Sequence, residues 1–163
     1  MMTGKLRYGV FLVLAATGLV ILSCKKSTTQ QTASNAVLTQ AAITHFTVQI
    51  YISSHPNLMA VNGIDTIPQS PNVGIKGLLI YRASTSTEPE FYAYERACTY
   101  DGLSNANAKV AAASGSFTCK DNVCGSIFSI ADGSGQPTHG PATYALKQYH
   151  CSYDGTNVLI VSN

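Results

Sequence analysis

Short apolar segments, separated by turns rich in glycine and proline, constrain the fold of this chain more than any other feature. Residues 45–52 (HFTVQIYI) alternate between apolar and polar side chains, which is typical of a strand with one buried face. Residues 77–82 (GLLIYR) form a nearly continuous apolar run, which favours a strand buried on both faces. A turn over residues 84–89 then predicts that residues 91–97 return as the hairpin partner of that strand.

A second hairpin is predicted at the C-terminal end. Residues 146–153 and 158–162 flank Asp154-Gly155, and Asp-Gly between apolar segments is a strong hairpin signal. Many short strands joined by such turns indicate a small antiparallel sandwich or barrel. We therefore expect an all-β domain over residues 37–163.

Other segments of the domain are less regular. Residues 37–43 fit either a helical turn or the start of the first strand, and residues 58–61 predict a short strand. Residues 105–113 are rich in alanine and predict a strand edge or a loop, with one helical turn as the alternative. Turns are expected over residues 132–135 and 137–141, which are rich in glycine and proline. Turns are also expected at the helix- and strand-breaking residues between the first two strands, which are Pro56, Gly63, Pro68, Pro71 and Gly74.

The N-terminal residues predict a targeting segment. Lys5 and Arg7 precede an apolar run over residues 10–22, and this pattern is typical of a helical secretory signal whose core is too short for a transmembrane span. Ile-Leu-Ser-Cys at residues 21–24 resembles a bacterial lipoprotein box, in which Cys24 is acylated and becomes the new N-terminus. The alternative is an uncleaved anchor helix. Either interpretation places the rest of the chain outside the cytoplasm and on a membrane.

The organisation that follows is a signal peptide (residues 1–23), a lipidated flexible tether (residues 24–36) and the β domain. Of ten basic residues, Lys5 and Arg7 leave with the signal, so eight basic residues face eight acidic ones. This balance excludes nucleic-acid binding, which needs a clustered basic surface. The expected partners are the membrane, through the lipid anchor, and an unidentified envelope protein. In a Bacteroidetes-type host an acidic run after Cys24 would suggest surface display; Lys25 and Lys26 stand there instead, so we favour the periplasmic face of the outer membrane.

Three segments resemble consecutive parts of a Rieske iron–sulfur domain: residues 90–101 (EFYAYERACTYD), 123–128 (VCGSIF) and 140–149 (GPATYALKQY). In that family a hairpin strand leads into a Cys-x-His loop, and a second loop, Cys-x-x-His-Gly-Ser-x-Phe, follows. A Gly-Pro-Ala turn then covers the cluster before a closing hairpin. The resemblance extends over roughly residues 75–163 and implies a small Rieske-like β sandwich or barrel.

The resemblance also assigns positions to the cluster ligands. A Rieske [2Fe–2S] cluster uses two thiolates on one iron and two imidazoles on the other. Cys98 takes the first thiolate position, Tyr100 the first imidazole position, Asp121 the second thiolate position and Cys124 the second imidazole position, with Cys119 displaced by two residues. Tyrosine and aspartate are poor ligands for iron–sulfur centres. The resemblance therefore implies a domain that has lost most of its cluster ligands.

The remaining chemistry lies in the cysteines and one histidine. In an oxidising envelope four cysteines in a small domain usually pair. The resemblance implies that Cys98 pairs with Cys119 or Cys124, which would close a loop of roughly twenty residues and contribute about 3 kcal/mol, and that Cys151 takes the other. A four-thiolate site for zinc or an all-cysteine cluster is the alternative, although the spacing from Cys119 to Cys124 is wide for a zinc knuckle. His139 would lie near the cluster position, either as an unorthodox ligand or as a solvated loop residue.

Two functions from different classes remain. No Ser–His–Asp arrangement, carboxylate pair or phosphate-binding glycine loop indicates an enzyme. We favour a lipid-anchored envelope protein whose β domain is a disulfide-braced binding or structural module without a cofactor. The alternative is an electron-transfer protein with a [2Fe–2S] or other metal centre, such as zinc, on altered ligands, partnering a membrane oxidoreductase. A subunit of a larger surface complex is a third hypothesis.

Overall fold

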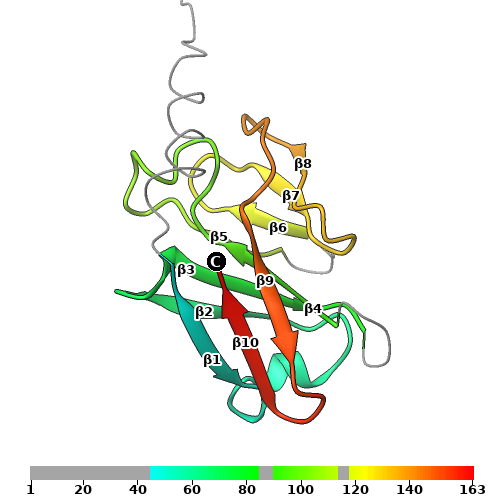
Figure 1. The fold of residues 1–163 in the computed structure, drawn as a ribbon. Coiled ribbons are helices and arrows are strands. Elements are labelled where there is room, and N and C mark those ends of the chain that lie inside the picture. Colours follow the sequence, from blue (N-terminus) through cyan, green and yellow to red (C-terminus); the bar gives the residue numbers. More distant parts are fainter. Residues whose placement is uncertain (1–44, 85–89, 114–117) are drawn as a thin grey trace, which may run out of the picture.

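A computed structural model describes residues 45–84, 90–113 and 118–163 (Figure 1). The predicted signal peptide, the predicted tether and Cys24, the predicted lipidation site, lie in residues 1–36, outside the described part of the chain. Within the described ranges, no helix is both long enough and apolar enough to cross a membrane.

The described residues form ten strands in two antiparallel sheets, so the expected all-β class is confirmed. The larger sheet has six strands in the spatial order β1 (Thr47–Tyr51), β10 (Val158–Ser162), β9 (Gln148–Tyr153), β4 (Phe91–Glu95), β3 (Val73–Arg82) and β2 (Ile64–Ser70). The smaller sheet has four strands in the order β5 (Val110–Ala112), β6 (Thr118–Asp121), β7 (Ile127–Ser129) and β8 (Pro137–His139).

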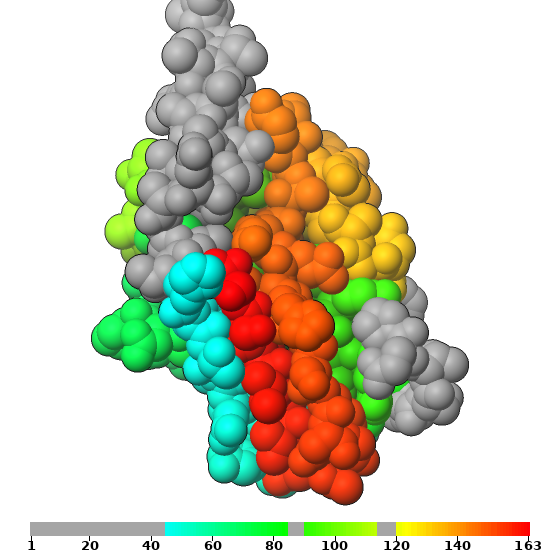
Figure 2. Space-filling view, in the orientation of Figure 1, coloured from blue at the N-terminus to red at the C-terminus, as the bar shows by residue number. Residues whose placement is uncertain are grey.

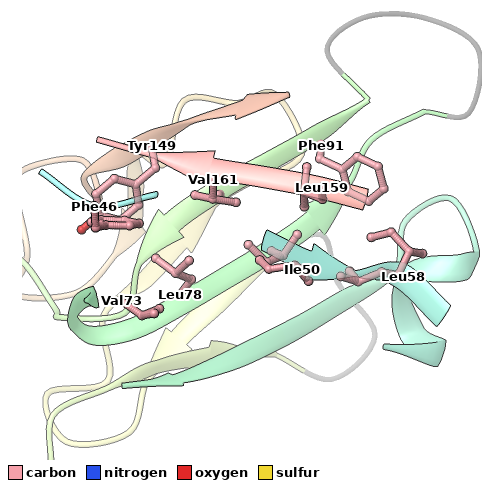
Figure 3. Packing of buried hydrophobic residues seen from close by; sticks show 12 residues of the cluster. Phe46, Ile50, Leu58, Val73, Leu78, Phe91, Tyr149, Leu159 and Val161 are labelled. Carbon is pink, nitrogen blue, oxygen red and sulfur yellow. The ribbon is translucent and has the colours of Figure 1, made fainter. Parts of the chain in front are cut away.

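The six-stranded sheet bends round a first core, which Figure 3 shows from close by. Ile50 on β1 and Leu159 on β10 pack with Leu78 on β3, although two strands separate β10 from β3 in the sheet order. In β1 the apolar side chains are buried or half-buried while Thr47 and Gln49 are exposed, as the alternation in the sequence predicts.

A second core lies between the outer face of β3 and β4 and the four-stranded sheet. Leu78 and Ile80 of β3 pack into the first core, while Leu79 and Tyr81 pack into the second. Strand β3 is therefore buried on both faces, which confirms the interpretation of the apolar run at residues 77–82. The hairpin that β3 forms with β4 is confirmed as well.

A buried carboxylate fixes the end of β4. Glu95 has no exposed surface and accepts hydrogen bonds from the backbone N–H groups of Ile75 (2.7 Å), Lys76 (2.8 Å) and Ala97 (3.0 Å). The hydroxyl of Tyr149 donates a fourth, at 2.7 Å. Burial, followed by the charge of Glu95, raises the pKa of Tyr149 far above its ordinary value. Glu95 thus joins β3, β4 and β9 directly before the loop that begins at residue 96.

The C-terminal hairpin of β9 and β10 is also confirmed, with a loop longer than the Asp154-Gly155 pair. Oδ1 of Asp154 accepts hydrogen bonds from the backbone N–H groups of Thr156 (2.8 Å), Asn157 (2.8 Å) and Val158 (3.0 Å). These bonds favour the charged carboxylate and lower the pKa of Asp154 to about 2.

Two local predictions are wrong, and a third is incomplete. Pro56–Met59 forms a 3₁₀ helix where a strand was expected at residues 58–61, because proline suits the first turn of a helix. A strand, β2, runs through Pro68, where a turn was expected, and the turn expected over residues 137–141 begins as strand β8. Both strands lie at sheet edges, where proline is tolerated because it leaves no inner ladder bond unmade. The expected strand edge within residues 105–113 is present as β5.

Candidate functional site

Three loops meet at one end of the second core. They are the first loop (residues 96–109, after β4), the second loop (residues 122–126, between β6 and β7) and the third loop (residues 140–147, between β8 and β9). Thr99 Oγ1 of the first loop donates a hydrogen bond to the carbonyl of Tyr144 in the third, at 2.8 Å. The N–H of Ala142 in the third loop donates to Ser126 Oγ in the second, at 3.0 Å. The first and second loops are thus both fastened to the third.

Figure 2 shows the orange surface of β8 and the third loop beside the yellow surface of the residues from the second loop to β7, and β8 pairs with β7. The close approach depends on Gly140, whose φ of +144° is rare for other residues. A Cβ atom at this position would lie 2.5 Å from Ser126 Oγ. The Gly-Pro-Ala turn therefore packs on the second loop through backbone atoms.

Two cysteines lie side by side where the loops meet. Sγ of Cys98 in the first loop is 3.6 Å from Sγ of Cys124 in the second, and the two sulfurs are not bonded to each other in this structure. Cys98 is fully buried in the second core, and Cys124 is half-buried. Ser126 Oγ lies 3.0 Å from Cys124 Sγ, within hydrogen-bond distance.

Two carboxylates complete the site. One donor atom from each of Cys98, Asp101, Asp121 and Cys124 lies within 4.8 Å of every other, and we call these four residues the Cys/Asp group. In the sequence the group consists of two short pairs, Cys-x-x-Asp in the first loop and Asp-x-x-Cys across the end of β6. The first loop thus contributes one sulfur and one carboxylate, the end of β6 contributes the second carboxylate, and the second loop contributes the second sulfur.

The second loop is shaped by Asp121. Its Oδ1 atom accepts hydrogen bonds from the backbone N–H groups of Val123 and Cys124, both at 2.8 Å, so the carboxylate closes a tight Asx-type turn. The N–H of Asp121 donates to the carbonyl of Ser126 at 2.8 Å, and Gly125 supplies a left-handed residue with a φ of +76°. This turn holds Cys124 towards the first loop.

The first loop places its pair by a single helical turn. The N–H of Gly102 donates to the carbonyl of Cys98 at 2.9 Å, and the N–H of Asn105 donates to the carbonyl of Asp101, also at 2.9 Å. Residues three apart in a helical turn face the same side, so Asp101 and Cys98 both face the second loop.

Two oxygen atoms of this site are buried without a hydrogen-bond partner: Asp101 Oδ1 and Asp121 Oδ2. They are the buried side-chain nitrogen or oxygen atoms that lack a partner in the part of the chain that the structure describes, and both belong to the Cys/Asp group. A buried acceptor left unsatisfied costs about 1–3 kcal/mol. Among the described residues, nothing donates a hydrogen bond to these two oxygen atoms.

Burial also sets the ionisation of the group. It raises the pKa of Cys98 well above the ordinary value of a thiol, and it raises the pKa of Cys124, against the hydrogen bonds from Ser126. The pKa of Asp101 is raised as well, first by burial and then by the nearby charge of Asp121. Without a cation, both sulfurs are neutral thiols at neutral pH.

The other residues singled out from the sequence lie elsewhere. Tyr100 packs at the edge of the second core, and His139 is exposed on β8. Cys119 lies on β6 with its backbone opposite Phe128, but its side chain is outside the described structure. Cys151 lies on β9 beside the first core, where burial raises its pKa to about 12. A disulfide that includes Cys119 or Cys151 stays a prediction.

The residues present do not fit a Rieske cluster. No histidine belongs to the Cys/Asp group within the described ranges, so the two imidazoles on one iron have no counterpart. Carboxylates are hard ligands that suit iron–sulfur centres poorly. Donors on opposite irons must also be separated by the length of the cluster, and four atoms mutually within 4.8 Å leave room for one ion.

Sequence reasoning missed Asp101 and Ser126. The signal for Asp101 was its position three residues after Cys98, which mirrors the spacing of Asp121 and Cys124. Ser126 was noted only as part of a motif, although it contacts both Cys124 and the third loop.

Comparison with known proteins gives similarity to ferredoxins in structure. No protein-family model matches the chain, and no curated protein matches it. A chain of the complex of reduced oxygenase and oxidized ferredoxin in carbazole 1,9a-dioxygenase is 18% identical, with 72% of this chain and 94% of that chain covered and a TM-score of 0.47. Sphingomonas yanoikuyae B1 ferredoxin is 16% identical, with 71% of this chain and 98% of that chain covered and a TM-score of 0.47.

Proposed function

We propose that this chain is a lipid-anchored envelope protein with a Rieske-like β domain in which a Cys98–Cys124 disulfide replaces the cluster as the link between loops. The domain then acts as a binding or structural module and not as an electron carrier. The observation that carries this proposal is the 3.6 Å separation of the two sulfur atoms, one in the first loop and one in the second. The lipoprotein box that ends at Cys24 supports the anchor and the oxidising compartment.

The geometry suits bond formation. A disulfide needs a sulfur–sulfur distance of about 2.05 Å, so the two atoms must approach by roughly 1.5 Å. Both cysteines lie in loops and not within a strand ladder, so a small change of side-chain rotamer and loop position is sufficient.

The reaction is an exchange with a small-molecule or protein disulfide. Cys98 and Cys124 each give up a thiol hydrogen and together lose two electrons as the bond between their sulfurs forms. The disulfide of the oxidant accepts both electrons and both protons, and its sulfur–sulfur bond breaks to give two thiols.

The full chain, purified in detergent without reductant, tests this function. We expect colourless protein without iron, in which Cys98 and Cys124 resist alkylation after denaturation and react only after reduction. A visible absorption band with about two irons per chain would instead support the electron-transfer hypothesis and overturn the proposal. Free Cys98 and Cys124 thiols in protein handled without reductant would also overturn it.

A further inference from the structure

The disulfide leaves part of the site unexplained. Asp121 has no exposed surface, yet its Oδ2 atom has no hydrogen-bond partner within the described ranges. Asp101 is half-buried, but its Oδ1 atom is also buried without such a partner. One carboxylate oxygen of each aspartate lies within 4.8 Å of both sulfurs. A sulfur–sulfur bond would satisfy neither of the two buried oxygen atoms.

We propose that the reduced chain binds one divalent cation of the zinc class through the sulfurs of Cys98 and Cys124 and the carboxylate oxygens of Asp101 and Asp121. This site uses the same two sulfurs as the proposed disulfide. The inference rests on the proposed function only in the statement that the oxidised chain does not bind the cation. The cation and the disulfide exclude each other, and the redox state of the pair decides which one is present.

The sulfur positions fit a single tetrahedral ion. Two zinc–sulfur bonds of about 2.3 Å at the tetrahedral angle place the sulfur atoms about 3.8 Å apart. The distance between Cys98 Sγ and Cys124 Sγ is 3.6 Å, so a metal needs almost no movement of the two loops. The disulfide needs a larger approach of the same atoms.

The backbone of each loop also holds the two carboxylates near the sulfurs. Asp121 Oδ1 is held by the N–H groups of Val123 and Cys124, while Oδ2 is buried and has no hydrogen-bond partner among the described residues. Carboxylates that bind metals in proteins usually accept hydrogen bonds from neighbouring groups, as Asp121 does. Asp101 supplies the fourth donor from the helical turn of the first loop.

The chemistry of the donors selects the ion. Calcium and magnesium prefer oxygen ligands alone, whereas thiolates favour zinc and similar softer ions. Binding releases one proton from each thiol, because the cation binds thiolates. The two positive charges of the cation offset the two negative charges of the thiolates. Four protein ligands close the coordination shell, which is typical of structural zinc sites.

The test uses the full chain in detergent, reduced and freed of metal with a chelator under anaerobic conditions. Cobalt(II) is added as a coloured probe of zinc sites, and zinc(II) is then added to displace it. We expect one cobalt ion per chain, an absorption band from sulfur-to-cobalt charge transfer, and loss of the band with zinc. The oxidised chain should bind neither ion.

Variants decide whether the Cys/Asp group is the site. Asp101→Asn and Asp121→Asn should each weaken cobalt binding at least tenfold, because outer-shell changes alone cost about 10–100-fold. Cys98→Ser and Cys124→Ser should lose the sulfur band. Asp132→Asn, an exposed carboxylate, and Cys151→Ala, a thiol beside the first core, are matched controls that should bind as the unchanged chain does.

Circular dichroism of each variant checks that the domain is folded. Unchanged cobalt affinity in folded Asp101→Asn and Asp121→Asn variants would overturn the proposal, and so would reduced protein that binds no cobalt. If a Cys98–Cys124 disulfide then still forms on oxidation, the proposed function stands and the cation site alone fails. Bound iron with a visible cluster band would overturn both.

Discussion

The disulfide between the first and second loops should stabilise the domain by an amount that follows from its position in the chain. Cys98 and Cys124 are 26 residues apart, and a loop of that length gives about 3.5 kcal/mol at 25 °C from the lost entropy of the unfolded chain. For a urea m-value of about 2 kcal/mol/M, the midpoint of unfolding should fall by roughly 1.5–2 M on reduction.

The assay is urea unfolding of the full chain in detergent, followed by circular dichroism, with and without reductant. A chelator is present throughout, so that a bound cation cannot stabilise the reduced chain. Cys98→Ala and Cys124→Ala should each remove the dependence on reductant, whereas Cys151→Ala should keep it. Equal midpoints for the oxidised and reduced chain would show that no stabilising disulfide joins the first and second loops.

Three further predictions concern the scaffold. Glu95→Ala should destabilise the domain by roughly 3–5 kcal/mol, because it leaves three backbone N–H groups and the Tyr149 hydroxyl without their acceptor; a loss below about 1 kcal/mol in urea unfolding would contradict this. The lowered pKa of Asp154, about 2, means that its carboxylate stabilises the hairpin above the ordinary aspartate pKa and that this contribution is lost as the pH falls through 2. Asp154→Asn should therefore lower the urea midpoint at pH 6 and not at pH 2, and an equal effect at both would argue against the hydrogen bonds as the cause. The pKa of Cys151 is raised to about 12, so its neutral thiol contributes stability that is complete below pH 9 and is lost as the pH rises through 12. Cys151→Ala should flatten the alkaline decline in thermal stability, and an unchanged decline would count against burial of that thiol.

The strands that could be predicted are those whose burial determines a regular pattern of apolar side chains, either alternating or continuous. Residues 45–52 alternate because one face of β1 covers the first core, and residues 77–82 are apolar throughout because β3 separates two cores. Strands β2 and β8 could not be predicted, because each contains a proline and stands at a sheet edge. Whether a strand is an edge depends on its neighbours in space, and proline is compatible with that position alone.

The site was only partly predictable for a similar reason. The expected nearness of Cys98 to the second loop came from the resemblance to Rieske domains and not from the cysteine spacing itself. A helical turn places Asp101 in the site, and no apolar periodicity in residues 96–109 predicts that turn. Asp121 was assigned to a thiolate position, whereas its carboxylate both shapes the second loop and faces the two sulfurs.

Cys98 and Cys124 should form one disulfide where the first and second loops meet. Trypsin cleaves after Arg96, Lys109, Lys120 and Lys147, so each of the four cysteines of the domain lies on a peptide of its own. Mass spectrometry of the unreduced digest of the full chain should find the peptide of residues 97–109 joined to that of residues 121–147. A link from Cys98 to the peptide of residues 110–120 or 148–163 would contradict the account.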